Sequence, residues 1–189
     1  MKQRMIVLLA ALLLLGVGQA DAQKRKAVRK AAKTVAAAVP VTIDDPVVVD
    51  GHIAFLGVPL GQAKAKIDAA LGEKGFKLTK LEVGEEVRGT AYGAQWTLWV
   101  ADDGKNLTLT EVSDHKKAQA KRRMTALVAG LQAKCGGTVE PYDAYNADGG
   151  EGKAITCPAG TIRVYYRDAD EVNFSGMSFL VCVEFADKQ

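Results

Sequence analysis

The chain has 189 residues, of which 48% are hydrophobic and 25% are charged, and its formal net charge is +3. A chain of this length can bury a sizeable core, either as one compact domain or as two small repeats. The near-neutral total conceals a strongly basic N-terminal segment followed by an acidic remainder.

Residues 1–22 have the three parts of a secretory signal peptide. Lys2 and Arg4 precede an apolar run over residues 5–17, and small residues follow it up to Ala22. The run is too short to favour a retained membrane span, and no cysteine stands at the cleavage point to accept a lipid. We predict cleavage after Ala22 and an exported protein, periplasmic or secreted, of a bacterium.

Residues 23–50 read as a basic, alanine-rich tail and an extended lead-in. The tail contains six basic residues and no acid up to residue 40, whereas the chain from Val41 onward has 17 Lys and Arg against 21 Asp and Glu, a formal charge of −4. The six are Lys24, Arg25, Lys26, Arg29, Lys30 and Lys33. The favoured interpretation of this tail is a solvated linker, because its apolar side offers only Ala and Val; weak contact with an anionic membrane surface through the basic residues is the alternative. Nucleic acid is not an expected partner of an exported chain.

The first predicted unit, residues 51–113, begins with a strand over residues 53–58. A short helix follows, and Gly75 is expected to end it in a left-handed conformation that folds Phe76 back onto Leu71. Turns that contain glycine then separate four further strands, which predict an antiparallel meander. These strands are expected over residues 77–83, 87–92, 95–101 and 106–112.

The second predicted unit, residues 114–189, repeats this order. Ser113 or Asp114 is expected to cap a helix with a regular apolar stripe, and Gly136 ends it. Strands are expected over residues 138–142, 153–157, 161–167 and 178–185. The sequence thus predicts an α+β fold of two tandem units, in which a helix covers one face of a four-stranded antiparallel sheet and the other face is open to water.

Strand alternation assigns side chains to the two faces of each sheet. Trp96 and its alternate neighbours should meet a helix, whereas the opposite face is largely polar but carries large aromatic and Arg side chains. Such side chains tend to anchor protein interfaces. The predicted binding residues are Trp99, Arg163, Tyr165 and Arg167. The alternative is an ordinary solvated sheet with aromatic cross-strand pairs.

The three cysteines, Cys135, Cys157 and Cys182, all lie in the exported part of the chain, where disulfides form. At most one internal bond is available to them. Cys135 and Cys157 are each expected on the core side of their element, so they are the favoured pair. The other two pairings and a fully reduced set stay open.

No catalytic constellation is recognised in the sequence. His52 and His115 have no second ligand at helical spacing, so neither a tetrahedral metal site nor a triad can be assembled from neighbouring residues. The acidic loop 143–151 departs from the EF-hand calcium template at ligand positions and at its glycine. We therefore expect neither enzymatic activity nor a metal or other cofactor.

Two resemblances bear on this chain. Residues 55–61, Phe-Leu-Gly-Val-Pro-Leu-Gly, and then Lys74-Gly75-Phe76 and the pair Gly89 and Gly93, resemble a set of uncharacterised exported bacterial proteins with the pattern F-x-G-[IV]-P-[IL]-x-G, a helix, K-G-F and G-x-x-x-G. The repeated order of one helix and four strands is similar to the β-lactamase inhibitor protein fold. That second resemblance is architectural, and it implies a sheet face that grips an enzyme.

Three functional hypotheses follow from these features. The first is an exported, non-enzymatic binding module whose open sheet face holds a protein or a component of the cell envelope. The second is an inhibitor of an exported hydrolase that uses the same face. The third is a small envelope enzyme, which requires a deep pocket with converging titratable groups.

Overall fold

The computed structural model describes residues 41–82, 84–143, 151–169 and 178–188. All of them belong to one compact unit that spans Ala38–Gln189. The signal peptide predicted over residues 1–22 and the basic tail up to residue 40 lie outside the described residues. Most of the acidic loop 143–151 lies outside them too.

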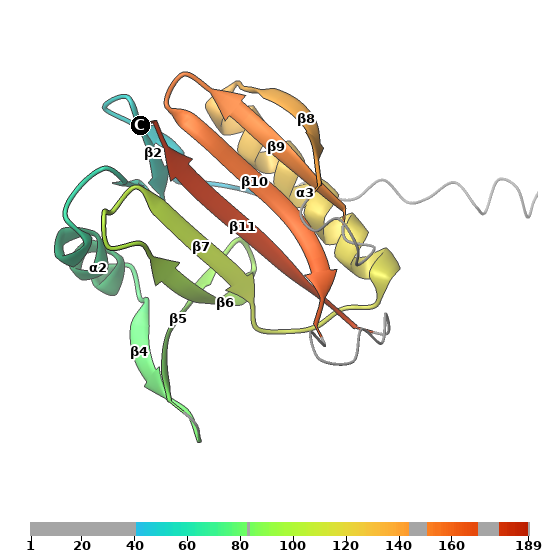
Figure 1. Cartoon of the computed structure of the whole chain (residues 1–189), viewed down its shortest axis with the longest axis horizontal. Coiled ribbons are helices and arrows are strands. Elements are labelled where there is room, and N and C mark those ends of the chain that lie inside the picture. Colours follow the sequence, from blue (N-terminus) through green and yellow to red (C-terminus); the bar gives the residue numbers. More distant parts are fainter. Residues whose placement is uncertain (1–40, 83, 144–150, 170–177, 189) are drawn as a thin grey trace, which may run out of the picture. The chain divides into compact units, whose positions relative to one another are not determined.

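An eight-stranded sheet forms the centre of this unit, in the order β4-β5-β6-β7-β11-β10-β9-β8, with every neighbouring pair antiparallel (Figure 1). The strands are β4 (Lys77–Lys80), β5 (Glu85–Ala91), β6 (Ala94–Val100), β7 (Asn106–Glu111), β8 (Thr138–Tyr142), β9 (Glu151–Cys157), β10 (Gly160–Asp168) and β11 (Phe179–Asp187). Each consecutive group of four forms one half of the sheet. The two halves meet where β7 pairs with β11.

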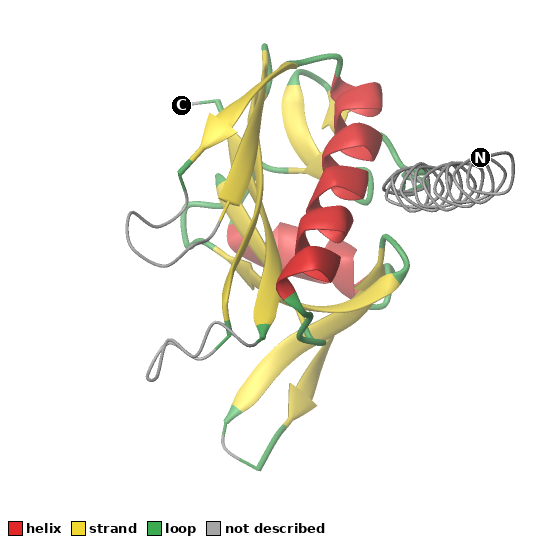
Figure 2. Ribbon diagram, turned by 90° about the vertical axis from the view of Figure 1, so that its right-hand side faces the viewer, coloured by secondary structure: helices red, strands yellow, loops and turns green. Residues whose placement is uncertain are grey.

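Two helices are found in the described residues, α2 (Lys64–Glu73) and α3 (Lys117–Cys135). Helix α3 packs across β9, β10 and β11, and α2 contacts β6; Figure 2 shows α3 running along one side of the strands. The end of α2 is as predicted, because Gly75 has a φ of 96° and the Phe76 N–H donates to the Leu71 carbonyl at 3.0 Å.

A second, three-stranded sheet consists of β1 (Val48–Val49), β2 (His52–Phe55) and β3 (Val58–Pro59), and β2 packs against β10 and β11. The prediction of one strand over residues 53–58 was therefore wrong. Leu56 and Gly57 have φ values of 51° and 75°, which fold the chain into a tight hairpin that pairs Phe55 with Val58.

The predicted start of the second helix was also wrong. The N–H groups of His115 and Phe179 each donate to the other residue's carbonyl at 2.8 Å, which keeps the chain extended past Ser113 and Asp114. Helix α3 begins after Lys116, whose N–H donates to Oε1 of Gln119 at 3.2 Å.

The core lies between the large sheet and the elements that cover its helix-facing side. Trp96, Leu98 and Val100 are at most 8% exposed, and residues of β10 and β11 join them from the other half of the sheet. These include Ile162, Val164, Val181, Val183 and Phe185, all fully buried. The predicted α+β class and the inward side of the strand alternation are confirmed.

Candidate binding surface

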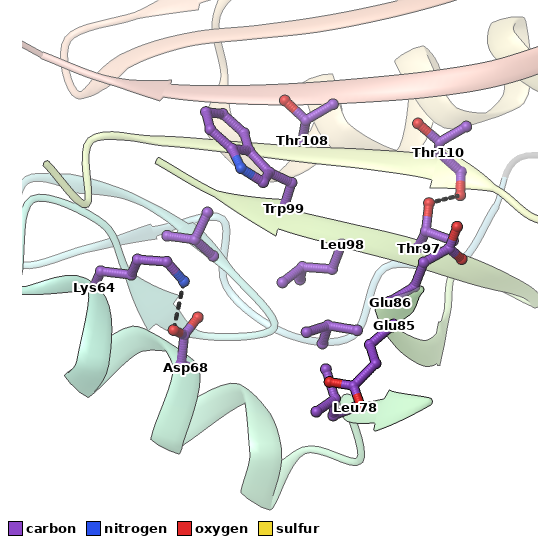
Figure 3. A pocket seen from close by; sticks show the side chains of 12 residues that line it. Lys64, Asp68, Leu78, Glu85, Glu86, Thr97, Leu98, Trp99, Thr108 and Thr110 are labelled. Carbon is purple, nitrogen blue, oxygen red and sulfur yellow. Dashed lines mark hydrogen bonds and ion pairs between the residues drawn. The ribbon is translucent and has the colours of Figure 1, made fainter. Parts of the chain in front are cut away.

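Two large apolar side chains are strongly exposed in the described residues, and they lie beside the same hollow. Trp99 on β6 is 60% exposed and Leu78 on β4 is 62% exposed. The hollow has a volume of about 360 Å³, and Figure 3 shows Trp99 on one side of it and Lys64 and Asp68 of α2 on another. We call this place the Trp99 hollow; it is lined by Lys64, Asp68, Leu78, Glu85, Glu86, Val87, Thr97, Leu98, Trp99, Val100, Thr108 and Thr110.

The hollow exists because two neighbouring strands separate. The ladder between β5 and β6 ends at the Val87–Leu98 pair, whereas β5 stays paired with β4 as far as Glu85. The β4–β5 hairpin therefore leaves the plane of the sheet, and it projects from the rest of the strands in Figures 1 and 2. A wedge opens between the hairpin and the last two residues of β6.

Main-chain groups face into this wedge. The Ala101 N–H donates to the Asn106 carbonyl at 2.9 Å, so the main chain of Ala101 is directed toward β7. Because neighbouring residues of a strand direct their N–H and C=O groups to opposite sides, those of Val100 point to the β5 side. The residue opposite Val100 in a continued ladder would be Glu85, but the ladder between β5 and β6 stops before that pair.

The rim of the hollow is acidic. Lys64 Nζ lies 2.6 Å from Asp68 Oδ2, and Arg88 lies 2.9 Å from Glu86 Oε2 at the edge. Glu85 is exposed and forms no ion pair with any residue that the structure describes. The lining side chains themselves comprise one cation and three carboxylates, which gives the hollow a negative field.

The other three predicted binding residues lie on the second half of the same face, and two of them, Arg163 and Tyr165, share the partner Glu184. Tyr165 donates from its hydroxyl to Glu184 Oε1 at 2.8 Å, and Arg163 Nη1 lies 3.3 Å from Glu184 Oε2. The Tyr142 ring lies 5.8 Å from that of Tyr165 and 5.4 Å from the Arg163 guanidinium. We call Tyr142, Arg163, Tyr165 and Glu184 the tyrosine cluster.

One prediction about this cluster was wrong. Tyr165 was expected to stand out into solvent beside Trp99, but it is only 5% exposed. Its neighbour on β9 is Gly152, which has no side chain to hold the Tyr142 ring away. Tyr165 is thus on the expected face of the sheet but is covered by neighbours on that face.

Trp99 and the tyrosine cluster are separate places on one face. Trp99 pairs with Thr108, Thr108 with Glu184, and Glu184 with Arg163. Three strand spacings of about 4.8 Å put Trp99 roughly 14 Å from Arg163. Arg167 lies further along β10 and is close enough to Cys182 to lower the pKa of that thiol, although burial raises it more.

Two polar clusters were not anticipated from the sequence. His52 Nδ1 lies 2.8 Å from Asp187 Oδ2, and the other oxygen of this buried carboxylate accepts the Ile53 N–H at 2.9 Å. Glu111, also buried, lies 3.3 Å from Arg123 Nε and 3.4 Å from His115 Nε2. The sequence gives no indication of either cluster, because His52 and Asp187, like Glu111 and Arg123, come from different elements that only the fold brings together.

The described residues contain no group of three or more His, Cys, Asp and Glu side chains arranged to hold a metal ion. Among the same residues, neither helix combines the length and the apolar character that crossing a bilayer requires. Comparison of the chain with protein-family models, with curated proteins and with solved structures finds no match. The function is therefore argued from the surface itself.

Proposed function

We propose that this protein is an exported, non-enzymatic binding module that holds an extended segment of a partner protein in the Trp99 hollow. The proposal depends chiefly on one observation: the exposed Trp99 and Leu78 line a single concave place. Large apolar side chains that gather at one place on a surface mark sites of interaction, since their burial by a partner is favourable.

An extended segment fits the wedge better than a helix does. The N–H and C=O of Val100 face the gap left by the β4–β5 hairpin, and the partner strand at this position is missing from the ladder. A peptide strand that enters the gap would satisfy these groups with its own main chain. Its alternate side chains would then contact Trp99 on one side and the α2 edge on the other.

The charge of the rim specifies the chemistry of the partner. Glu85, which has no ion-pair partner among the described residues, favours Lys or Arg in the bound segment, whereas Trp99 and Leu78 favour an aromatic or aliphatic residue next to it. The bound segment is therefore a short stretch in which an apolar residue is flanked by basic ones. The tyrosine cluster is assigned no direct role, because its side chains already contact one another.

The proposal also includes the architecture inferred from the sequence. Four strands after each helix run inward from the two edges of the sheet, and the last strand of each group lies at the centre. This order supports two tandem α-β4 units and a likeness to the β-lactamase inhibitor protein fold, in which a shared sheet presents one face to a partner.

Selection from a display library of short random peptides tests the proposal. The mature protein is the bait, and the affinity of each selected peptide is then measured for the wild type, for Trp99→Ala and for Arg163→Ala. We expect the selected peptides to carry an apolar residue with Lys or Arg beside it and to bind Trp99→Ala at least about tenfold more weakly, as for a central aromatic anchor.

Two controls make the result specific. Trp99→Ala should keep the stability of the wild type to within about 0.5 kcal/mol, because the side chain is mostly in solvent. Arg163→Ala, in the tyrosine cluster, should bind the selected peptides as the wild type does. Peptides that bind all three proteins equally well, or that are acidic, would contradict the proposal.

A further inference from the structure

The end of α3 is fixed closely against β9. Gly136 follows Cys135 with a φ of 66°, and its N–H donates to the Gln132 carbonyl at 2.8 Å. The next residue, Gly137, approaches β9 so closely that a Cβ there would stand 2.5 Å from the Thr156 carbonyl oxygen. The chain therefore passes from the helix to the sheet without room for a side chain between them.

This close approach brings two cysteines together. Strand β8 begins with Thr138 opposite Thr156, so the residues just before β8 lie at the Cys157 end of β9. Cys135 and Cys157 are both half-buried and pack against the same core. Burial raises the pKa of Cys135, the Gly137 N–H lowers it, and the adjacent Cys157 raises it again.

Cys182 is far from this pair. It lies within β11, is 1% exposed, and its sulfur is 3.8 Å from the Thr110 hydroxyl on the open face. On strand β10, Gly160 lies opposite Cys157 of β9, and Tyr165 lies opposite Cys182 of β11. These two positions are separated by roughly 17 Å along the strand, whereas a disulfide requires Cα atoms within about 7 Å.

We propose that Cys135 and Cys157, which are free thiols in this structure, form a disulfide in the exported protein and that Cys182 stays reduced. A low-molecular-weight disulfide such as oxidised glutathione would serve as the oxidant. One thiolate attacks it and forms a mixed disulfide, with release of one glutathione thiol. The second thiolate then displaces the other glutathione, so two electrons and two protons pass from the protein to two glutathione molecules. The bond links the end of α3 to the end of β9.

Thiol counting and peptide mapping test this inference on the whole mature chain. The protein is equilibrated with oxidised glutathione, unfolded in guanidinium and alkylated without reduction, and the peptides are identified by mass spectrometry. We expect one alkylated residue, Cys182, and a linked pair of peptides that carries Cys135 and Cys157. Mild reduction before unfolding should release that pair and yield three alkylated cysteines.

Two cysteine variants test whether the bond joins Cys135 to Cys157. Cys182→Ser should retain the linked peptides and show no free thiol. Cys157→Ser should give no linked pair: Cys182 stays a free thiol, and Cys135 is found as a glutathione adduct because no second thiol is present to displace the glutathione. Three free thiols in the oxidised wild type would overturn the inference. So would a linked peptide that contains Cys182, or a glutathione adduct at Cys135 or Cys157 in place of the bond between them. These readouts do not depend on any binding partner.

Discussion

Tyr166 shows how burial of a single side chain makes stability depend on pH. Its ring is fully buried and lies 5.6 Å from that of Phe179. Burial, together with the nearby Glu151 carboxylate, raises the pKa of Tyr166 to about 12. In the unfolded chain the phenol ionises near its ordinary pKa of about 10. The native state therefore holds its proton over a range of pH in which the unfolded state has lost it.

Stability should accordingly fall as the pH rises from 10 to 12, by up to roughly 2–3 kcal/mol from this residue. Burial raises the pKa of Tyr92 as well, so its contribution has the same sign. The measurement is the free energy of unfolding in denaturant at a series of pH values. Tyr166→Phe should flatten the decline relative to the wild type, and two parallel curves would contradict this account.

The residues of the candidate site were predictable only where strand alternation alone decides exposure. Trp99 is exposed as predicted, because no neighbour on its face covers it. Tyr165 follows the same alternation but is covered, since Gly152 lets the Tyr142 ring approach. That contact joins residues of β8 and β10, and their register depends on the fold rather than on either segment. The roles of Arg163 and Arg167 in binding stay predictions.

At the scale of elements, a glycine determines how β4 and β5 connect to the core. Phe76 is 3% exposed, and its ring packs edge-on against that of Phe55 at 5.4 Å. It also lies over Gly89, where an added Cβ would stand 2.6 Å from the ring carbons. The absence of a side chain at Gly89 therefore allows the start of β4 to pack under the second half of β5.

Gly89→Ala should destabilise the protein by about 1–3 kcal/mol, because Phe76 must move out of a filled site. Gly72→Ala is the matched control: it lies in α2 with nothing within 4 Å of the new Cβ, and it should be neutral or stabilising by up to about 1 kcal/mol. Chemical denaturation of both variants measures the difference. Equal stabilities for the two would show that Phe76 is not confined by Gly89.

Most elements were predictable because their signals are local. The apolar stripe of α3 and its glycine end at Gly136 are present in the sequence, as are the turns between strands. The errors arose where a contact distant in the chain prevailed. The pairing of His115 with Phe179 delays the start of α3, although Ser113 and Asp114 are good helix caps by themselves.

At the scale of the whole described unit, the pairing of strands that are distant in the chain could not be predicted from the sequence. The sequence predicted two four-stranded sheets. It did not predict that β7 would pair with β11 and join the eight strands into one sheet. Nor did it predict that the β4–β5 hairpin would leave β6 after Leu98. The Trp99 hollow results from that departure, so its shape depends on the tertiary structure even though Trp99 itself was predicted.

The most direct test of the central claim is an NMR titration of isotope-labelled protein, residues 23–189, with a peptide obtained by the selection described above. We predict that the Trp99 indole N–H and the amides of Val100 and Glu85 show the largest shifts, and that amide exchange at Val100 slows on binding as a new strand hydrogen bond forms. Shifts confined to the outer face of α3 or to the tyrosine cluster, with no change at Val100, would contradict the account.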